Sequence, residues 1–361
     1  MPSPENPFRQ PPPNLDPDQA SFLEQFAGAS EEELETAGIK SEKPPKPKTE
    51  IEFGTDDLSA TTPDAEVHRY TDETIEFRGV KIRRGEKDLL EGILKKINTD
   101  RSKSGLEPFD WDTGIMKLNG SRIYIDNDGF VSELYLGDSG LLDTDNLNLP
   151  QKIKGLGLNG TLISNLDNFL IPPLVEKLFL SEMPISSVRN IKLPPNLKEL
   201  GLGNTKIENL EGVSFPQTLK DINFYAAQLT TISGIRWPSS LEKLTFEDTK
   251  ITSIADSVFP ENLKTLSFEH TPLAEIAGVI FPEGIERINF MSTQISSLDD
   301  IHLPESIISL NLSGTAIKTL RGIQLPRNLS ELFITGTRVS DEEIAEIQTQ
   351  MPNCKIFNTK H

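Results

Sequence analysis

The sequence has a single cysteine, Cys354, and only four histidines among its 361 residues. One thiol excludes an intramolecular disulfide framework and any cysteine-rich metal cluster. No apolar run approaches the roughly 20 residues of a membrane-spanning helix, and residues 1–18 lack the apolar core of a secretory signal. We therefore expect a soluble, cytoplasmic protein without a cofactor, although export by a specialised route would leave no recognisable trace.

Basic residues are outnumbered, since 36 lysines and arginines stand against 55 aspartates and glutamates and the formal net charge is -19. Binding to a nucleic-acid backbone or to an anionic membrane needs a surface rich in lysine and arginine. We therefore expect neither a nucleic-acid nor a membrane partner. Basic or neutral partners are favoured instead.

A repeat begins at Leu149, where an apolar residue followed by proline starts to recur every 22 residues. The apolar residues of these pairs are Leu149, Ile171, Leu193, Phe215, Trp237, Phe259, Phe281, Leu303 and Leu325. When each unit is numbered from this residue, positions 5, 8 and 10 are aliphatic or phenylalanine throughout. The pair at positions 8 and 10 has the period of a strand, which sends both side chains to one face. Each unit therefore predicts one short strand.

Two further positions indicate turns. Position 13 is threonine in all units except two, which have Met183 and Ala227, and the aliphatic residue at position 15 indicates that the chain turns back into the core. Position 20 carries residue types that readily accept a positive φ, namely Asn168, Asn190, Gly212, Gly234, Asp256, Gly278, Asp300 and Gly322. We expect a tight turn there in every unit. Proline and glycine in the return segment favour extended or short 3₁₀ segments over an α-helix.

The pattern L-P-x-x-L-x-x-L-x-L-x-x-T-x-I resembles the leucine-rich-repeat family and covers about two thirds of the chain. The resemblance implies an α/β solenoid, or horseshoe, with a parallel inner sheet and a mostly non-helical convex side. The family usually has asparagine where this sequence mostly has threonine, so we expect the hydrogen-bonded ladder at that corner to be built from hydroxyls. A single unit buries too little apolar surface to fold alone, so the ends of the array need caps.

The segments before the repeats divide into two predicted parts. Residues 1–60 are rich in proline and glutamate and poor in aromatic residues, which predicts a disordered tail. Residues 61–126 are predicted to form an N-terminal capping subdomain similar to those of receptor-type leucine-rich-repeat proteins, without their paired cysteines. Its pattern comprises Leu89, Leu90, Ile93, Leu94 and Ile97 on one helix face, then Phe109, Trp111, Ile115 and the alternating pair Ile123 and Ile125.

The repeats are predicted to span residues 127–339, with one degenerate coil ahead of nine 22-residue units. Residues 340–361 are predicted to form a C-terminal cap. Ser340 and Glu343 have the spacing of a capping box that opens a helix through about Gln350. A last strand is expected near Ile356, with Cys354 filling the core beside it.

Metal and phosphate chemistry have little support in the sequence. Aspartates at 126 and 128 invite a calcium-loop interpretation, but Gly129 would then place tyrosines at the first and last ligand positions, so a turn between strands fits better. The histidines, His68, His270, His302 and His361, show no metal-ligand spacing. We expect no catalytic, cofactor or metal site.

One enzymatic alternative comes from bacterial effectors in which similar repeats precede a ubiquitin-ligase domain with a nucleophilic cysteine. The segment after Val339 is too short for such a domain, and Cys354 has only the terminal His361 near it in sequence. We therefore expect an adaptor or a binding module in preference to an enzyme.

The residues between and beside the apolar pairs are expected to project from the concave face of the sheet. Aromatic residues and arginine are enriched at interface hot spots. The predicted partner-binding residues are Tyr135, Phe179, Tyr225, Arg287 and Phe333. The sequence thus predicts a monomeric module that binds a protein on this face. The alternative is an adaptor or effector-like scaffold whose partner motifs lie in the tail of residues 1–60.

Overall fold

The computed structural model describes residues 49–50, 73–77, 80–108, 122–299 and 301–359. The chain divides into two units, residues 1–48 and 49–361, and the first lies outside the described residues. The predictions for Phe109, Trp111, Ile115 and Asp300 also fall outside the described residues, as does most of the predicted tail. No helix in the described part of the chain is long and apolar enough to span a membrane.

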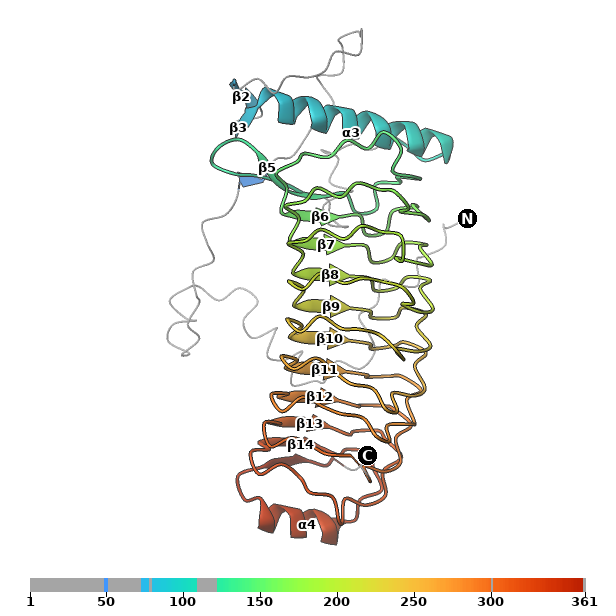
Figure 1. Cartoon of the computed structure of the whole chain (residues 1–361), viewed down its shortest axis with the longest axis vertical. Coiled ribbons are helices and arrows are strands. Elements are labelled where there is room, and N and C mark those ends of the chain that lie inside the picture. Colours follow the sequence, from blue (N-terminus) through green and yellow to red (C-terminus); the bar gives the residue numbers. More distant parts are fainter. Residues whose placement is uncertain (1–48, 51–72, 78–79, 109–121, 300, 360–361) are drawn as a thin grey trace, which may run out of the picture. The chain divides into compact units, whose positions relative to one another are not determined.

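The described part of the second unit is built on a thirteen-stranded sheet that contains one strand for each coil (Figure 1). Its strands, in spatial order, are β1 (Thr49–Glu50), β4 (Arg122–Ile125), β5 (Val131–Tyr135), β6 (Gly155–Gly157), β7 (Lys177–Phe179), β8 (Glu199–Gly201), β9 (Asp221–Asn223), β10 (Lys243–Thr245), β11 (Thr265–Ser267), β12 (Arg287–Asn289), β13 (Ser309–Asn311), β14 (Glu331–Phe333) and β15 (Lys355–Phe357). From β5 to β15 each strand is parallel to the strand that follows it, which confirms the predicted solenoid with a parallel sheet.

Each repeat strand has its middle residue in the core. In β7, Leu178 is fully buried, while Lys177 and Phe179 on either side point the other way and are half-buried. The 22-residue spacing brings Leu178 into register with Leu156 and Leu200 of the adjoining coils. Burial of the same apolar positions in successive coils makes one continuous core, because each coil covers the apolar side of the next.

Four stacked phenylalanines fill the middle of this core. Phe224, Phe246, Phe268 and Phe290 occupy position 10 of successive units and are fully buried. The ring centroids of Phe246 and Phe268 lie 5.0 Å apart with their planes 16° from parallel. Phe224 and Phe246 lie 5.5 Å apart and are parallel within 1°.

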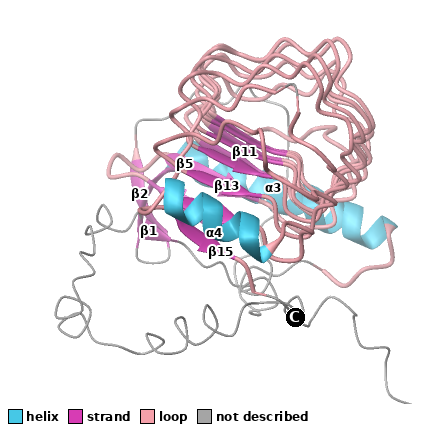
Figure 2. Cartoon of the chain, turned by 90° about the horizontal axis from the view of Figure 1, so that it is seen from below, coloured by secondary structure: helices cyan, strands magenta, loops and turns pink. Residues whose placement is uncertain are grey.

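The return segments consist of turns and extended chain on the side opposite the strands (Figure 2). From Pro172 onward, the proline at the start of each unit begins a turn. In the first of these turns the carbonyl of Pro172 accepts a hydrogen bond from Val175 N. No helix occurs in the described return segments, which confirms the mostly non-helical side, and of the two predicted forms the chain adopts the extended one with turns.

Left-handed backbone occurs at two corners of the coil, of which the sequence predicted one. At position 20 the φ angle is positive at Asn168, Gly212, Gly234, Asp256, Gly278 and Gly322, whereas Asn190 is an exception to the prediction. The second corner is position 12, where even Glu182 and Ala226 have φ of 60° and 54°. The backbone N–H of position 12 donates to a carbonyl of the next coil, and Ala226 N donates to Glu247 O at 2.8 Å. This inter-coil hydrogen bond offsets the steric cost of the conformation.

The threonines of position 13 do not form the expected ladder between coils. The hydroxyl of Thr249 donates to Phe246 O in its own coil at 2.7 Å, and the hydroxyl of Thr271 donates to Phe268 O at 2.6 Å. Four other threonines make the same bond, namely Thr205, Thr293, Thr315 and Thr337. A threonine hydroxyl is too short to reach past its own turn, so it satisfies the carbonyl at the end of its own apolar pair.

Helix α3 (Arg84–Lys103) closes the array beside β5 and β6, where an amphipathic helix was predicted (Figure 1). Its carboxylate Asp100 is fully buried, accepts from Leu142 N at 3.2 Å and pairs with Lys96 Nζ at 2.7 Å. Glu86, also buried, accepts from Val131 N at 2.9 Å. Two side chains thus join the helix to the first coils.

Three antiparallel pairings occur at the α3 end of the described residues, and one of them joins β4 to β5. Strands β2 (Thr74–Phe77) and β3 (Val80–Arg83) pair with each other, and β1 pairs with β4. The β1 residues depart from the disorder predicted for residues 1–60, because they cover backbone groups of β4 that would otherwise form a sheet edge. The turn between β4 and β5 is the predicted one, since Asp126 Oδ1 accepts from the N–H groups of Asp128 and Phe130.

Helix α4 (Asp341–Gln350) closes the other end, where the sequence predicted it. Ser340 Oγ accepts from Glu343 N at 3.3 Å, which is one half of the capping box. The Glu343 carboxylate does not complete the box. It instead accepts from Leu320 N and from the Thr319 hydroxyl in the preceding coil, so it fastens the helix to the array.

Candidate binding surface

The side of the sheet away from the core forms a surface that we call the open face. It consists of positions 7, 9 and 11 of each unit, which alternate with the buried positions 8 and 10. Three regions can be distinguished on it: an aromatic end at β5 to β8, a paired-charge edge where the strands begin, and an edge where the strands end.

The aromatic end contains Tyr135 and Phe179, whose ring centroids lie 6.2 Å apart. Tyr135 lies over Gly157, where a Cβ would be only 2.6 Å from Cδ1 of the tyrosine ring. Phe179 lies over Gly201 in the same way, with 3.0 Å from its Cδ1 to a Cβ. Glycine at these two strand positions therefore lets the rings lie flat on the sheet. Burial, together with the adjacent Glu133 carboxylate, raises the pKa of Tyr135.

The edge where the strands begin is a set of ion pairs between adjacent coils. Lys177 Nζ lies 3.2 Å from Glu199 Oε1, and Lys243 Nζ lies 3.3 Å from Asp221 Oδ2. Further pairs between coils are Lys198–Glu176, Lys220–Glu242 and Lys264–Glu286, and Arg287 pairs with Glu286 within one coil. These charges are partly exposed and compensate one another, so each pair adds little to stability.

The edge where the strands end is centred on Tyr225, which is 48% exposed. Its neighbours are Glu247, Asp248 and Glu269, and the charge of Asp248, followed by partial burial, raises the pKa of Tyr225. The imidazole of His270 is 3.7 Å from Asp248 Oδ1 and 3.8 Å from Glu269 Oε1.

Several central residues expected to project freely are committed to the fold. Asn223 Oδ1 accepts from Tyr225 N at 2.7 Å, and Asn289 Oδ1 accepts from Met291 N at 3.0 Å. Thr245 and Ser267 are buried between longer side chains. Short polar groups in the middle of the strands thus lie beneath the surface that a partner would touch.

The five predicted partner-binding residues all lie on the open face but do not form one cluster. Tyr225 and Arg287 are exposed, and Tyr135 and Phe179 are half-buried against each other. Phe333 was expected to be exposed but is half-buried, because the ring of Phe357 in the closing coil stacks on it at 4.3 Å. Phe357, 40% exposed, is an aromatic residue of the face that the sequence analysis missed.

A second set of exposed apolar residues lies in the return segments. Leu170, Val258 and Ile280 all occupy position 22 and are 82%, 62% and 59% exposed. Val258 and Ile280 are joined by an isolated parallel bridge. These exposed residues form a second surface on which a partner protein could bind, and they serve as controls for the open face.

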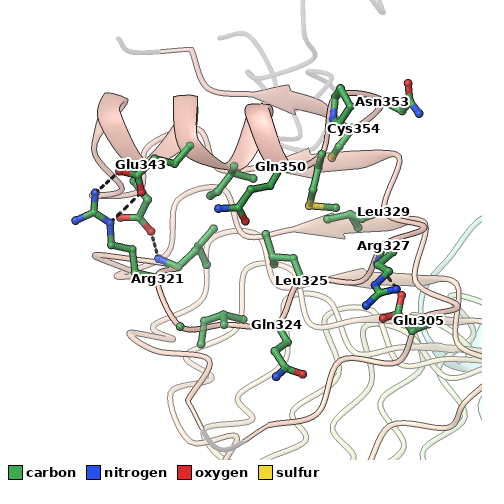
Figure 3. Close-up of a pocket in the computed structure, with 17 residues that line it drawn as sticks. Glu305, Arg321, Gln324, Leu325, Arg327, Leu329, Glu343, Gln350, Asn353 and Cys354 are labelled. Atoms are coloured by element: carbon green, nitrogen blue, oxygen red, sulfur yellow. Dashed lines mark hydrogen bonds and ion pairs between the residues drawn. The ribbon is translucent and has the colours of Figure 1, made fainter.

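A cavity of about 770 Å³ lies between α4 and the last coil (Figure 3). Cys354 lines it beside Leu329 and is only 3% exposed. Burial raises the pKa of the Cys354 thiol, which disfavours the thiolate. No histidine is among the lining residues, and the described residues contain no group of three or more potential metal ligands.

A sequence model of the BspA type leucine rich repeat region matches the chain in six copies, over residues 143–252 and 224–334. These ranges together cover more than half of the sequence. No curated protein matches the sequence.

Solved structures of other repeat proteins are similar over part of the chain. YopM from Yersinia enterocolitica WA-314 is 19% identical over 59% of this chain and 48% of its own, with a TM-score of 0.45. The APL1 leucine-rich repeat domain is 16% identical over 64% and 59%, with a TM-score of 0.45. An internalin, InlF from Listeria monocytogenes, is 15% identical over 77% and 90%, with a TM-score of 0.39. The chain thus spans about half to three fifths of the first two.

Proposed function

Because the chain belongs to the BspA-type leucine-rich-repeat family, we propose that it is a protein-binding module whose partner docks on the open face. One observation carries this proposal. The parallel strands hold aromatic and charged side chains on one side of a continuous core, and they leave Tyr225 and Arg287 exposed at the two edges of that side. Aromatic residues and arginine on a preorganised surface are the groups that dominate binding at protein interfaces.

An enzymatic role has less support from the same features. The buried Cys354 has a raised pKa and lacks a histidine in its cavity, whereas a nucleophilic cysteine needs an accessible and activated thiolate. We therefore propose binding and no catalysis. Any activity retained by a folded Cys354→Ala variant would show that this thiol is not a nucleophile.

The test compares surfaces on the full chain. A partner captured from a lysate is purified, and its affinity for Tyr225→Ala and Arg287→Ala is measured by surface plasmon resonance. Each variant should weaken binding by about fivefold or more, the loss expected when a hot-spot side chain is truncated. Melting temperature should not change, because both side chains are exposed.

The controls are Leu170→Ala and Val258→Ala on the return segments, which remove side chains that are at least as exposed as Tyr225. Loss of binding in these controls with retention in the open-face variants would refute the proposal. Deletion of residues 1–48 tests the alternative of partner motifs in the tail. Abolished binding after that deletion, with the open-face variants unaffected, would favour the tail.

A further inference from the structure

The two edges of the open face differ in charge. Positions 6 and 7, where the strands begin, carry basic and acidic residues in nearly equal numbers, and these pair between coils. Positions 11 and 12, where the strands end, carry no lysine or arginine in any of the nine units. Their charged residues are Glu182, Glu247, Asp248 and Glu269, with His270 as the one residue that can become cationic. Positions 11 and 12 are therefore acidic, and the groups that contact their carboxylates include His270, beside Asp248 and Glu269, and the amide of Asn289, which donates to Glu269.

Three of these carboxylates surround an exposed aromatic ring. Glu247 and Glu269 follow Tyr225 at position 11 of the next two coils, and Asp248 adjoins Glu247. Adjacent strands lie about 4.8 Å apart, so the three groups fall within a short span of the face. Among the described residues, none of the three carboxylates pairs with a lysine or arginine, and Lys250, two residues beyond Asp248, makes no ion pair with them. We call Tyr225, Glu247, Asp248 and Glu269 the acidic-aromatic group.

A buried hydroxyl in β11, two residues before Glu269, has no hydrogen-bond partner among the described residues. Ser267 is 5% exposed, and its Oγ is without a partner within the part of the chain that the structure describes. Because Leu266 and Phe268 on either side point into the core, alternation directs Ser267 to the open face, between Thr245 and Asn289 in the same row. Unsatisfied buried hydroxyls are costly, so Ser267 leaves a polar group without a bond two residues before Glu269 in the same coil.

From this arrangement we propose that the acidic-aromatic group docks an arginine- or lysine-rich segment of the partner polypeptide. The proposal rests on the proposed function and names the chemistry of its partner. A guanidinium or ammonium group over the ring of Tyr225 gains a cation-π contact, while Glu247, Asp248 and Glu269 supply the opposite charge. An anionic segment would meet uncompensated repulsion there.

The probe is a fluorescein-labelled peptide of ten residues in which arginine and glycine alternate, measured with the full chain by fluorescence anisotropy. A peptide with citrulline in place of arginine has the same shape without the charge. The wild-type chain should bind the arginine peptide and not the citrulline peptide, and raising the salt should weaken binding. Equal binding of the two peptides, or no binding of either, would overturn the proposal.

Charge-matched variants separate a site from the general attraction of an acidic protein. The triple variant Glu247→Gln, Asp248→Asn and Glu269→Gln should weaken binding of the arginine peptide at least tenfold. The control triple Glu208→Gln, Glu211→Gln and Glu261→Gln changes the net charge equally at exposed positions outside the strands, and it should weaken binding less than twofold. Equal losses in the two triples would overturn the proposal.

The ring is tested separately from the carboxylates. Tyr225→Phe keeps the aromatic face and should bind the arginine peptide within twofold of the wild type, whereas Tyr225→Leu should bind about two- to fivefold more weakly. Equal binding by both variants would remove the ring from the site. A natural partner whose binding depends on Arg287 and on none of the three carboxylates would overturn this inference and leave the proposed function intact.

Discussion

Truncation of one ring in the phenylalanine stack tests whether the core holds the coils together as described. Phe246 is fully buried, stacks on Phe224 and Phe268, and meets the indole of Trp237 at 6.0 Å and 64°. The change Phe246→Ala removes the ring from all three contacts. Because every coil touches mainly the coils beside it, the damage lies at the middle of the array.

The expected loss follows from the burial. Truncation of a fully buried phenylalanine to alanine costs about 3–5 kcal/mol through lost transfer energy and the cavity left behind. A leucine at the same position costs less, about 1–1.5 kcal/mol, because Leu158, Leu180 and Leu202 fill position 10 in earlier coils. Against a total stability of about 5–15 kcal/mol, the alanine variant should lose a large part of its margin.

The assay is equilibrium unfolding in urea, followed by circular dichroism on the wild type, Phe246→Ala and Phe246→Leu. The alanine variant should have a much lower midpoint, and its transition should broaden or split as the two halves of the array uncouple. The leucine variant should keep a single transition near the wild-type midpoint. A loss below about 1 kcal/mol in the alanine variant, or equal losses in both, would refute the role assigned to the stack.

Three further changes test the caps. Asp100→Asn should lower the free energy of unfolding by about 3 kcal/mol, because the buried partner of Lys96 is lost. Burial would raise the pKa of Asp100, but hydrogen bonds from Lys96, Leu142 N and Lys103 outweigh it and lower this pKa. The difference in stability between wild type and variant should therefore shrink as the pH falls through the lowered pKa of Asp100. Glu86→Gln should raise the Tm at pH 7, since burial raises the pKa of Glu86 and disfavours its folded carboxylate; the gain should vanish in acid below the unfolded pKa, and a lower Tm at pH 7 would contradict this. Glu343→Ala should cost about 1–3 kcal/mol in urea unfolding by leaving Leu320 N unsatisfied, and an unchanged midpoint would show that the carboxylate does not fasten the helix.

The repeat period was enough to predict the sheet, because burial of positions 5, 8 and 10 is a property of spacing. Both side chains of each apolar pair must face the core. Adjacent strands therefore align at equivalent positions 22 residues apart, as Leu178 does with Leu200. The helices α3 and α4 were predictable for a similar reason, since an apolar face and an N-cap serine are local signals.

The second left-handed corner was only partly signalled by residue types. Position 12 holds glycine, asparagine or aspartate in five of the nine units, but it also holds Glu182, Ala226 and Ser292, which do not favour a positive φ. The conformation is imposed by the hydrogen bond to the next coil, such as that from His270 N to Met291 O at 2.9 Å. Local propensity is overridden there by a contact between segments that are 22 residues apart.

The open face was predictable as a location and only partly as a site. Alternation placed Tyr135, Phe179 and Phe333 on the correct side of the sheet, but exposure depends on what lies in the adjoining coil. Phe333 is covered by Phe357, and Tyr135 lies down over Gly157. The exposure of these rings depends on the size of the side chains in neighbouring coils. The pattern of apolar positions contains no information about those sizes.

Oxidative footprinting of the full chain with and without its partner, read by mass spectrometry, tests the central claim most directly. Hydroxyl radicals label exposed aromatic, methionine and aliphatic side chains on both surfaces. Bound partner should protect Tyr225, Phe179 and Met291 on the open face and leave Leu170, Val258 and Ile280 labelled as before. Protection of those three return-segment residues, with the open face labelled unchanged, would contradict the account.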